Sequence, residues 1–358
     1  MISEPGSLAE LISRIEPCSQ IALDTEADSL HSYFEKLCLI QLSSRHEHVL
    51  IDPLAQMDLQ PLFDALAKKR IVFHGADYDM RLLNRTLNVQ FEDMFDTMIA
   101  SRLCGLKELG LAALVEKYFN VKLSKASQKA NWALRPLSDQ MVEYAMNDTR
   151  YLLDLGEILD AELRRLGRWE WFVQSRDRMI AAAKETRARD ENKAWRISGS
   201  AALSNRAQSV LRILWQWRDS EAQGWDRPAF HVLGNEDLLR ICEKSVQAEA
   251  FSTPRMSSRR RKSFEVVLAL ALQIPESEWP KQEKVRRKRP SHEQLARLDQ
   301  IRAVRDRVAK ELDLDPSIVA PRQALEAASE DAGTEALMPW QRQLLQLAPR
   351  EETLASTV

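Results

Sequence analysis

The stretch that decides the fold runs from residue 20 to residue 26 and reads QIALDTE. Residues 20–23 form a short aliphatic run that is typical of a buried strand, and Asp24 and Glu26 follow at its end. Because side chains alternate along a strand, residues two apart point to the same side. The stretch therefore predicts a sheet edge that presents two carboxylates together.

Around this strand the sequence alternates between strand and helix patterns. Short runs rich in aliphatic and β-branched residues predict further strands over 37–42, 48–51 and 71–74. Helical periodicity predicts helices over 59–68, 78–87, 97–103, 110–119 and 138–166, the last with Ser138 as its N-cap. We expect an α/β domain in which helices flank a mixed sheet.

Two more acidic residues complete the pattern. Asp79 opens the helix after strand 71–74, and Asp148 follows Tyr144 by one helical turn, on the same face. Four carboxylates gathered by the fold form an oxygen-only cage for two hard divalent cations, an arrangement that cuts phosphodiesters. Asp24, Glu26, Asp79 and Asp148 are the candidate metal ligands, and Tyr144 joins them as a candidate catalytic residue. Both residues also have a purely structural alternative. Asp79 could only interact favourably with the helix dipole, and Tyr144 could be a partly buried helix aromatic.

Bulk composition sets limits on the class of protein. The 358 residues exceed one ordinary core, and 44% hydrophobic with 29% charged residues is typical of globular chains. The longest apolar run, 264–274, is too short to span a bilayer, and the N-terminus lacks a basic segment followed by an apolar one. We expect a soluble, cytoplasmic protein without membrane contact. The four cysteines stand singly, which predicts reduced thiols.

From about residue 170 the strand signals disappear and the pattern is helical. A gapless repeat with an offset of 87 residues matches Leu211, Arg218-Asp219, Asp226, Val232 and Leu238 with Leu298, Arg305-Asp306, Asp313, Val319 and Leu325. It predicts two tandem copies of one small helical domain. The predicted domains are residues 1–170, a helical linker over 171–204, and helical domains over 205–283 and 291–350. Residues 281–290 predict a basic linker, and the last residues from 351 predict a frayed tail.

Charge is distributed unevenly along the chain. Acidic side chains outnumber basic ones over residues 1–165, whereas the remainder is net basic, with clusters at Arg255 and residues 259–262. The basic half is the better candidate for contact with a polyanion. Well-solvated charged helices are the alternative.

Several other residues are weaker functional candidates. His46 and His48 lack partners at zinc spacing and predict surface histidines. His74 either packs in the core or approaches substrate. Trp215 and Trp217 could stack on bases but are more typical of a helical core. No phosphate-binding G-x-x-x-x-G-K-[ST] loop is present, which disfavours an ATP-driven helicase.

Six ordered motifs carry a family resemblance: IALDTE at 21–26, LCLIQL at 37–42, HGADYD at 74–79, FDT at 95–97, WALRPL at 132–137 and YAMND at 144–148. They resemble ribonuclease D, a family of 3′-to-5′ exonucleases with three acidic motifs and a motif tyrosine. The resemblance covers roughly the first 165 residues. The tandem helical copies resemble HRDC domains, which are nucleic-acid-binding modules.

The resemblance implies a ribonuclease H-like sheet, two Mg²⁺ or Mn²⁺ ions, and release of nucleoside 5′-monophosphates. It implies that Asp24 bridges both ions, that Glu26 and Asp148 complete the site beside the attacking water, and that Asp79 serves the second ion. Tyr144 would hydrogen-bond the water. The chain departs from the family at Ala27-Asp28-Ser29, where an aromatic residue is usual, and at Asn131, where Asp is usual.

We therefore expect a metal-dependent exoribonuclease that trims 3′ extensions of structured RNA such as tRNA precursors. Its expected partners are RNA 3′ ends, without an obligate protein partner. A 3′-to-5′ DNA exonuclease in repair is an alternative, because no motif shows contact with the 2′-hydroxyl that distinguishes RNA from DNA. A non-catalytic RNA-binding protein on a nuclease scaffold is the second alternative.

Overall fold

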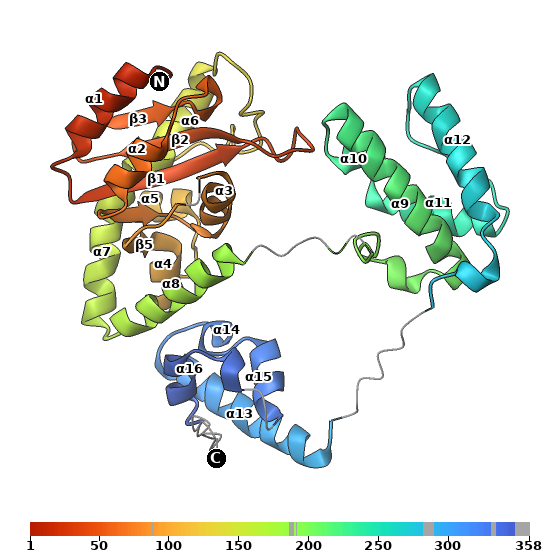
Figure 1. Cartoon of the computed structure of the whole chain (residues 1–358). Helices are drawn as coiled ribbons and strands as arrows, with labels where there is room; N and C mark the ends of the chain where they lie inside the picture. The colour runs from red at the N-terminus through yellow and green to blue at the C-terminus, as the bar shows by residue number, and fades with distance from the viewer. Residues whose placement is uncertain (88, 186–189, 191, 282–289, 331–333, 348–358) are drawn as a thin grey trace, which may run out of the picture. The chain divides into compact units, whose positions relative to one another are not determined.

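A computed structural model of the chain describes all residues except 88, 186–189, 191, 282–289, 331–333 and 348–358 (Figure 1). The chain divides into two compact units. The sheet unit comprises Met1–Glu26, Leu37–Glu185 and Lys288–Val358, and the helical unit comprises Ala27–Lys36 and Thr186–Arg287. Each unit is described by itself.

The sheet has five strands in the order β3-β2-β1-β4-β5. Their bounds are β1 Gln20–Ala27, β2 Leu37–Ser43, β3 His48–Ile51, β4 Arg70–Phe73 and β5 Asp93–Asp96. β1, β4 and β5 are parallel, whereas β2 and β3 are antiparallel. The predicted mixed α/β sheet is confirmed. β5 was not predicted as a strand, because four residues with an aspartate at each end give no alternating pattern.

Helices surround the sheet in the first half of the sheet unit. They are α1 Pro5–Ile15, η1 Pro53–Ala55, α2 Gln60–Leu66, α3 Asp77–Leu87, α4 Thr97–Leu103, α5 Leu111–Phe119, α6 Asp139–Arg150, α7 Leu152–Arg165 and α8 Trp169–Lys184. α1 was not predicted, although Leu8, Leu11 and Ile15 are buried at helical spacing. A buried cluster joins strand residues Ala22, Val72 and Phe95 to α7. This cluster packs α7 against the strands β1, β4 and β5.

The single helix predicted over 138–166 is two helices in the structure. α6 ends at Arg150 and α7 begins at Leu152, with Tyr151 between them at φ −102° and ψ −3°. α6 packs against β2 and β3, whereas α7 packs against β4, so the chain must turn between the two halves of the sheet. The predicted cap is confirmed, because the Ser138 side chain accepts a hydrogen bond from the Met141 amide at 3.3 Å.

The helical unit contains η2 Ser200–Ala202, α9 Asn205–Trp225, α10 Ala229–Val232, α11 Asn235–Val246, α12 Ser258–Leu272 and η3 Glu276–Glu278. Trp215 and Trp217 are buried in its core, as predicted. Residues 27–36 belong to this unit. Asp226 accepts hydrogen bonds from the amides of Tyr33 and Phe34 at 3.1 Å each. Asp28, at one of the family departures, is buried and accepts from the Lys36 amide at 2.8 Å, which closes the loop.

The last helices return to the sheet unit: α13 His292–Glu311, α14 Pro316–Val319, α15 Arg322–Ser329, η4 Thr334–Ala336 and α16 Pro339–Leu344. α13, α14 and α15 each begin 87 residues after α9, α10 and α11. The repeat extends to hydrogen bonds: Arg218 Nη1 donates to Leu233 O at 3.1 Å, and Arg305 Nη1 donates to Ala320 O at 3.5 Å. We call α9–α12 the first helical copy and the described residues of α13–α16 the second.

The predicted border between residues 170 and 171 lies within α8. α8 packs against α3 and α4, and its Phe172 lies 4.7 Å from Phe95, ring centre to ring centre. The helix therefore contributes to the core of the sheet unit. The limits of the four predicted domains stay a prediction. The basic linker, apart from residues 281 and 290, and the tail lie outside the described residues.

Within the described part of the chain, no helix combines the length and apolar character needed to cross a bilayer.

Candidate active site

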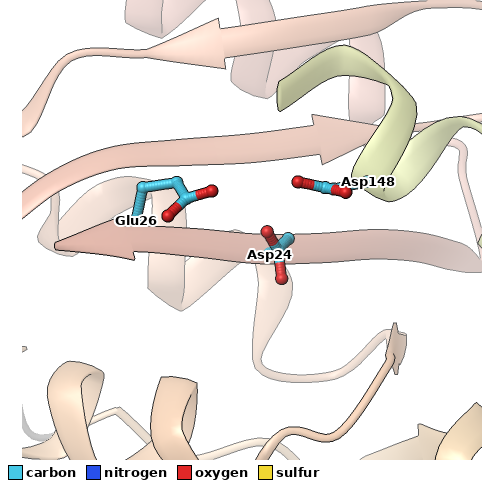
Figure 2. A group of neighbouring side chains, drawn as sticks. All are labelled: Asp24, Glu26 and Asp148. Carbon is cyan, nitrogen blue, oxygen red and sulfur yellow. The ribbon is translucent and has the colours of Figure 1, made fainter. Parts of the chain in front are cut away.

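Three carboxylates converge at the end of β1. Asp24 and Glu26 project from the same side of the strand, as its alternation predicts, and Asp148 reaches them from α6 (Figure 2). Each offers an oxygen, and these oxygens all lie within 4.8 Å of one another. Such a group of oxygen donors fits a hard divalent cation. The structure thus brings together residues that are separated by more than a hundred positions in the sequence.

Asp79 lies beside this group, on the first turn of α3. Its Oδ1 accepts hydrogen bonds from the Thr25 amide at 3.0 Å and the Thr25 hydroxyl at 2.5 Å. Asp79 is therefore tied to the backbone between Asp24 and Glu26, and a ligand role would fall to its other oxygen, Oδ2. The sequence predicted this carboxylate but not its bond to Thr25.

All four carboxylates line one cavity of about 380 Å³, together with Tyr144 and His74. We call it the catalytic cavity, because it is the candidate site of hydrolysis. Tyr144 stands one turn before Asp148 on α6, and its ring centre lies 5.9 Å from that of the buried Trp132. Burial, followed by the charge of Asp148, raises the pKa of Tyr144. The phenol therefore stays protonated at neutral pH and acts as a hydrogen-bonding group.

The carboxylates repel one another in a poorly solvated site. Burial and then the charge of Asp79 raise the pKa of Asp24 well above its usual range. Burial and then the charge of Asp148 raise the pKa of Glu26 to about 9. Burial raises the pKa of Asp148 to about 7, against a hydrogen bond to Tyr144, and that of Asp79 to about 6, against its bond to Thr25. The protein gathers carboxyl groups here without enough positive charge to keep them all ionised, which a bound cation would supply.

His74 forms part of the cavity wall. Its Nδ1 lies 2.9 Å from the Thr97 hydroxyl, which itself donates to the carbonyl of Phe73. Because that hydroxyl's proton is already used, His74 Nδ1 is the donor in this pair. Burial lowers the pKa of His74, so the ring is neutral and adds no positive charge to the site.

Asp96 holds the two helices that border the cavity. It caps α4 by accepting from the Met98 and Ile99 amides at 2.8 and 3.1 Å. It also accepts from the Gly75 and Ala76 amides at 3.0 and 2.8 Å, just before α3. In the sequence Asp96 stood out only as a member of the FDT motif. Its position just before a helix was the available signal for a cap.

A second support lies behind Tyr144. Arg135 donates to both oxygens of Asp52 at 2.6 Å, to the Cys38 carbonyl at 2.7 Å and to the Trp132 carbonyl at 2.8 Å. These bonds hold the loop that places Trp132 against Tyr144. This clamp was not predicted, because 83 residues separate its two charged partners. Asn131 accepts from the Ala133 amide at 3.2 Å, so this departure from the family pattern affects only the loop.

His46 and His48 take no part in the acidic group. His48 Nδ1 lies 2.9 Å from the Ser43 hydroxyl, and burial lowers its pKa. Among the described residues the group that could hold a metal ion consists of carboxylates alone.

The comparisons with known proteins follow the same division of the chain. Residues 1–164 match the 3′-5′ exonuclease family, and residues 207–264 match the HRDC domain. Ribonuclease D of Haemophilus influenzae is 30% identical, with the match covering 96% of this chain and 90% of the relative. The chain belongs to the ribonuclease D family. The expected family, activity class and fold are confirmed: the chain is a 3′-5′ exoribonuclease.

Solved structures show the same fold. The crystal structure of Escherichia coli RNase D is similar over 98% of this chain and 99% of its own, with a TM-score of 0.70 at 23% identity. A protein from Bifidobacterium adolescentis is similar over 96% and 94%, with a TM-score of 0.83 at 23% identity. This member of the ribonuclease D family therefore keeps the fold at low identity.

Proposed function

We propose that this member of the ribonuclease D family trims 3′ extensions from structured RNA, tRNA precursors among them, and releases nucleoside 5′-monophosphates. One observation carries the proposal: oxygens of Asp24, Glu26 and Asp148 meet within 4.8 Å, in a cavity that Tyr144 shares. A cytoplasmic location is part of the proposal, since it is where such precursors are processed.

The donor set fits two divalent ions, Mg²⁺ or Mn²⁺. Asp24, Glu26 and Asp148 would hold one ion, and Asp79 would hold the other together with Asp24. Every donor is a carboxylate oxygen, which hard cations prefer. When bound, a pair of such ions stabilises charge on the entering and leaving oxygens of an in-line displacement.

The chain's own residues prepare the reaction. Tyr144, held by Trp132 and kept protonated by its surroundings, orients the attacking water beside Asp148. The water oxygen bonds to phosphorus while the bond to the 3′ oxygen of the preceding nucleotide breaks. The attacking water gives up a proton to solvent and the leaving oxygen takes one up, so the shortened RNA ends in a 3′-hydroxyl and the product carries a 5′-phosphate.

The HRDC domain is assigned to RNA holding. At the start of α12, Arg259 and Arg260 pair with Glu221, whereas Lys262 is exposed beside them. Basic side chains at such a surface contact RNA phosphates. These contacts give an affinity that falls with rising salt and depends little on the RNA sequence.

The test offers the purified chain matched 3′-extended RNA and DNA, with Mg²⁺, with Mn²⁺ and with chelator. We expect metal-dependent release of ribonucleoside 5′-monophosphates from the RNA, identified by mass spectrometry. Faster hydrolysis of the DNA would favour the repair exonuclease. Hydrolysis that is unchanged by chelator would contradict the two-ion assignment.

A further inference from the structure

A second hollow, of about 670 Å³, opens beside the catalytic cavity. Tyr78 and Met98 line both, so the two spaces meet at these side chains. Met98 packs over Gly75, where a Cβ would lie 2.9 Å from the methionine methyl carbon. Tyr78 is 40% exposed and presents its ring at the junction.

A third hollow, of about 580 Å³, continues from the second, because Arg102, Ser317 and Ile318 line both. We call the second and third hollows together the lateral groove. Its one side comes from the start of α3 and from α4, and its other side comes from α8 and the second helical copy. The groove therefore leads from the carboxylates to a part of the chain that the catalytic site does not use.

The far wall of the groove is firmly built. Trp340 of α16 stacks on Trp171 of α8, with ring centres 4.7 Å apart and planes 12° apart. Arg168 Nη2 donates to the Leu312 carbonyl at 2.7 Å. Gly105, at φ +82°, lets the Asp313 carbonyl approach to 2.7 Å from the position of a Cβ. Within the described residues, the second helical copy is thus fixed to the part of the sheet unit that contains α4 and α8.

The groove combines an apolar floor with basic side chains. Ile99, Met179 and Ile318 form part of the floor, while Arg102, Arg178 and Lys107 are exposed along its length. Four acidic residues also line the groove. Three of them form hydrogen bonds or an ion pair with neighbouring residues, and Asp313 is the fourth. Asp77 pairs with Arg81, Asp96 caps α4, and Asp315 accepts from the Ser317 amide at 2.8 Å.

We propose that the lateral groove binds the single-stranded RNA segment on the 5′ side of the nucleotide being removed. The inference rests on the proposed function, since it takes the 3′ end to lie at the carboxylates. A strand that leaves that cavity past Tyr78 enters the groove. Its bases meet an exposed ring and apolar side chains, and its phosphates meet Arg102 and Lys107. Arg178 also holds the groove together, because its Nη1 donates to the Ala336 carbonyl at 2.9 Å.

The experiment measures kcat/KM on a length series of unstructured RNAs, from a dinucleotide to a decanucleotide. In the wild-type chain kcat/KM should rise with length until the groove is filled. The double variant Arg102→Gln, Lys107→Gln should reduce the ratio of decanucleotide to dinucleotide kcat/KM on the order of tenfold. Arg322→Gln, an exposed arginine of α15 outside the groove, should leave that ratio at the wild-type value.

A loss of activity could also come from misfolding, so the test includes a variant that is expected to gain activity. Ser317 is exposed in the groove, so Ser317→Lys should raise the same ratio by adding a cation. In an Asp24→Asn background, the Gln double variant should also lower the salt dependence of RNA binding, by about 0.7 in slope for each phosphate that is no longer neutralised.

The two hypotheses fail in different ways. A wild-type chain that hydrolyses no RNA of any length refutes the proposed function. A chain that hydrolyses all lengths, with a length ratio unaffected by the Gln and Lys variants, refutes the groove alone.

Discussion

The sheet unit contains two neighbouring regions that use buried carboxylates in opposite ways. In the catalytic cavity, Asp24, Glu26 and Asp148 face one another, and burial and repulsion raise their pKa values. At the clamp behind Tyr144, burial would raise the pKa of Asp52, but the hydrogen bonds and charge of Arg135 lower it. A carboxylate with its cation supplied by the chain stabilises the fold. Carboxylates without such a partner repel one another and favour the binding of cations.

The largest effect should come from removing charge at the centre of the catalytic cavity. Asp24→Asn keeps the shape of the side chain but removes the carboxylate that faces all three others, so turnover on RNA should fall by at least about 10³-fold. Steady-state assays on a 3′-extended RNA measure this, with circular dichroism as a check of folding. Asp64→Asn, an exposed carboxylate on α2, is the matched control and should retain activity. A folded Asp24→Asn variant with normal turnover would refute the assignment.

Tyr144→Phe tests the link between the two regions, because Tyr144 belongs to the cavity but is placed by the clamp through Trp132. The variant should slow the chemical step by about 10- to 100-fold and leave ion binding nearly normal. Single-turnover kinetics measure the first quantity and titration calorimetry with Mn²⁺ the second. Tyr118→Phe, a half-buried tyrosine of α5 outside the cavity, should change neither. Equal losses in chemistry and ion binding would contradict an orienting role.

Stability should respond with opposite signs in the two regions. Asp52→Asn leaves Arg135 without its charged partner and should lower the free energy of unfolding by about 2–3 kcal/mol. Glu26→Gln removes a group that the metal-free fold must keep protonated at a pH where the unfolded chain releases the proton. It should therefore raise the melting temperature of the metal-free chain, by about 2–4 °C for each kcal/mol relieved. Thermal unfolding in chelator at pH 8 measures both. A shift of the same sign in the two variants would remove the distinction drawn between these regions.

Much of the catalytic site could be predicted from local periodicity. Asp24 and Glu26 are two apart at a strand end, and Tyr144 and Asp148 are four apart on a helix, so each pair shares a face whatever the rest of the fold does. The clamp of Asp52 and Arg135 was beyond reach, because a bond across 83 residues leaves no local pattern. The same holds for the bond from Thr25 to Asp79 and for the turn at Tyr151, which follows from two different packing faces on the sheet.

The smallest expected effect, and the most direct measure of the missing charge, is proton release on ion binding. In the metal-free folded chain Glu26 keeps its proton up to about pH 9, whereas the unfolded chain loses it near pH 4.5. Between these values the unfolded state binds fewer protons, so rising pH should destabilise the metal-free fold. A cation must displace the same proton, so Glu26 alone should make the apparent affinity for Mn²⁺ rise up to about tenfold per pH unit between pH 6 and 9, and protons displaced from Asp24 and Asp148 should steepen that rise.

Calorimetry in two buffers of different ionisation enthalpy counts the protons released at each pH. Glu26→Gln should release fewer protons than the wild-type chain, and Asp52→Asn the same number, because Asp52 is already ionised beside Arg135. Ion binding that releases no protons at pH 7 would show that the cavity carboxylates are ionised before the cation arrives. The positive charge that balances them would then have to come from the chain, and the contrast between the catalytic cavity and the clamp would no longer rest on charge.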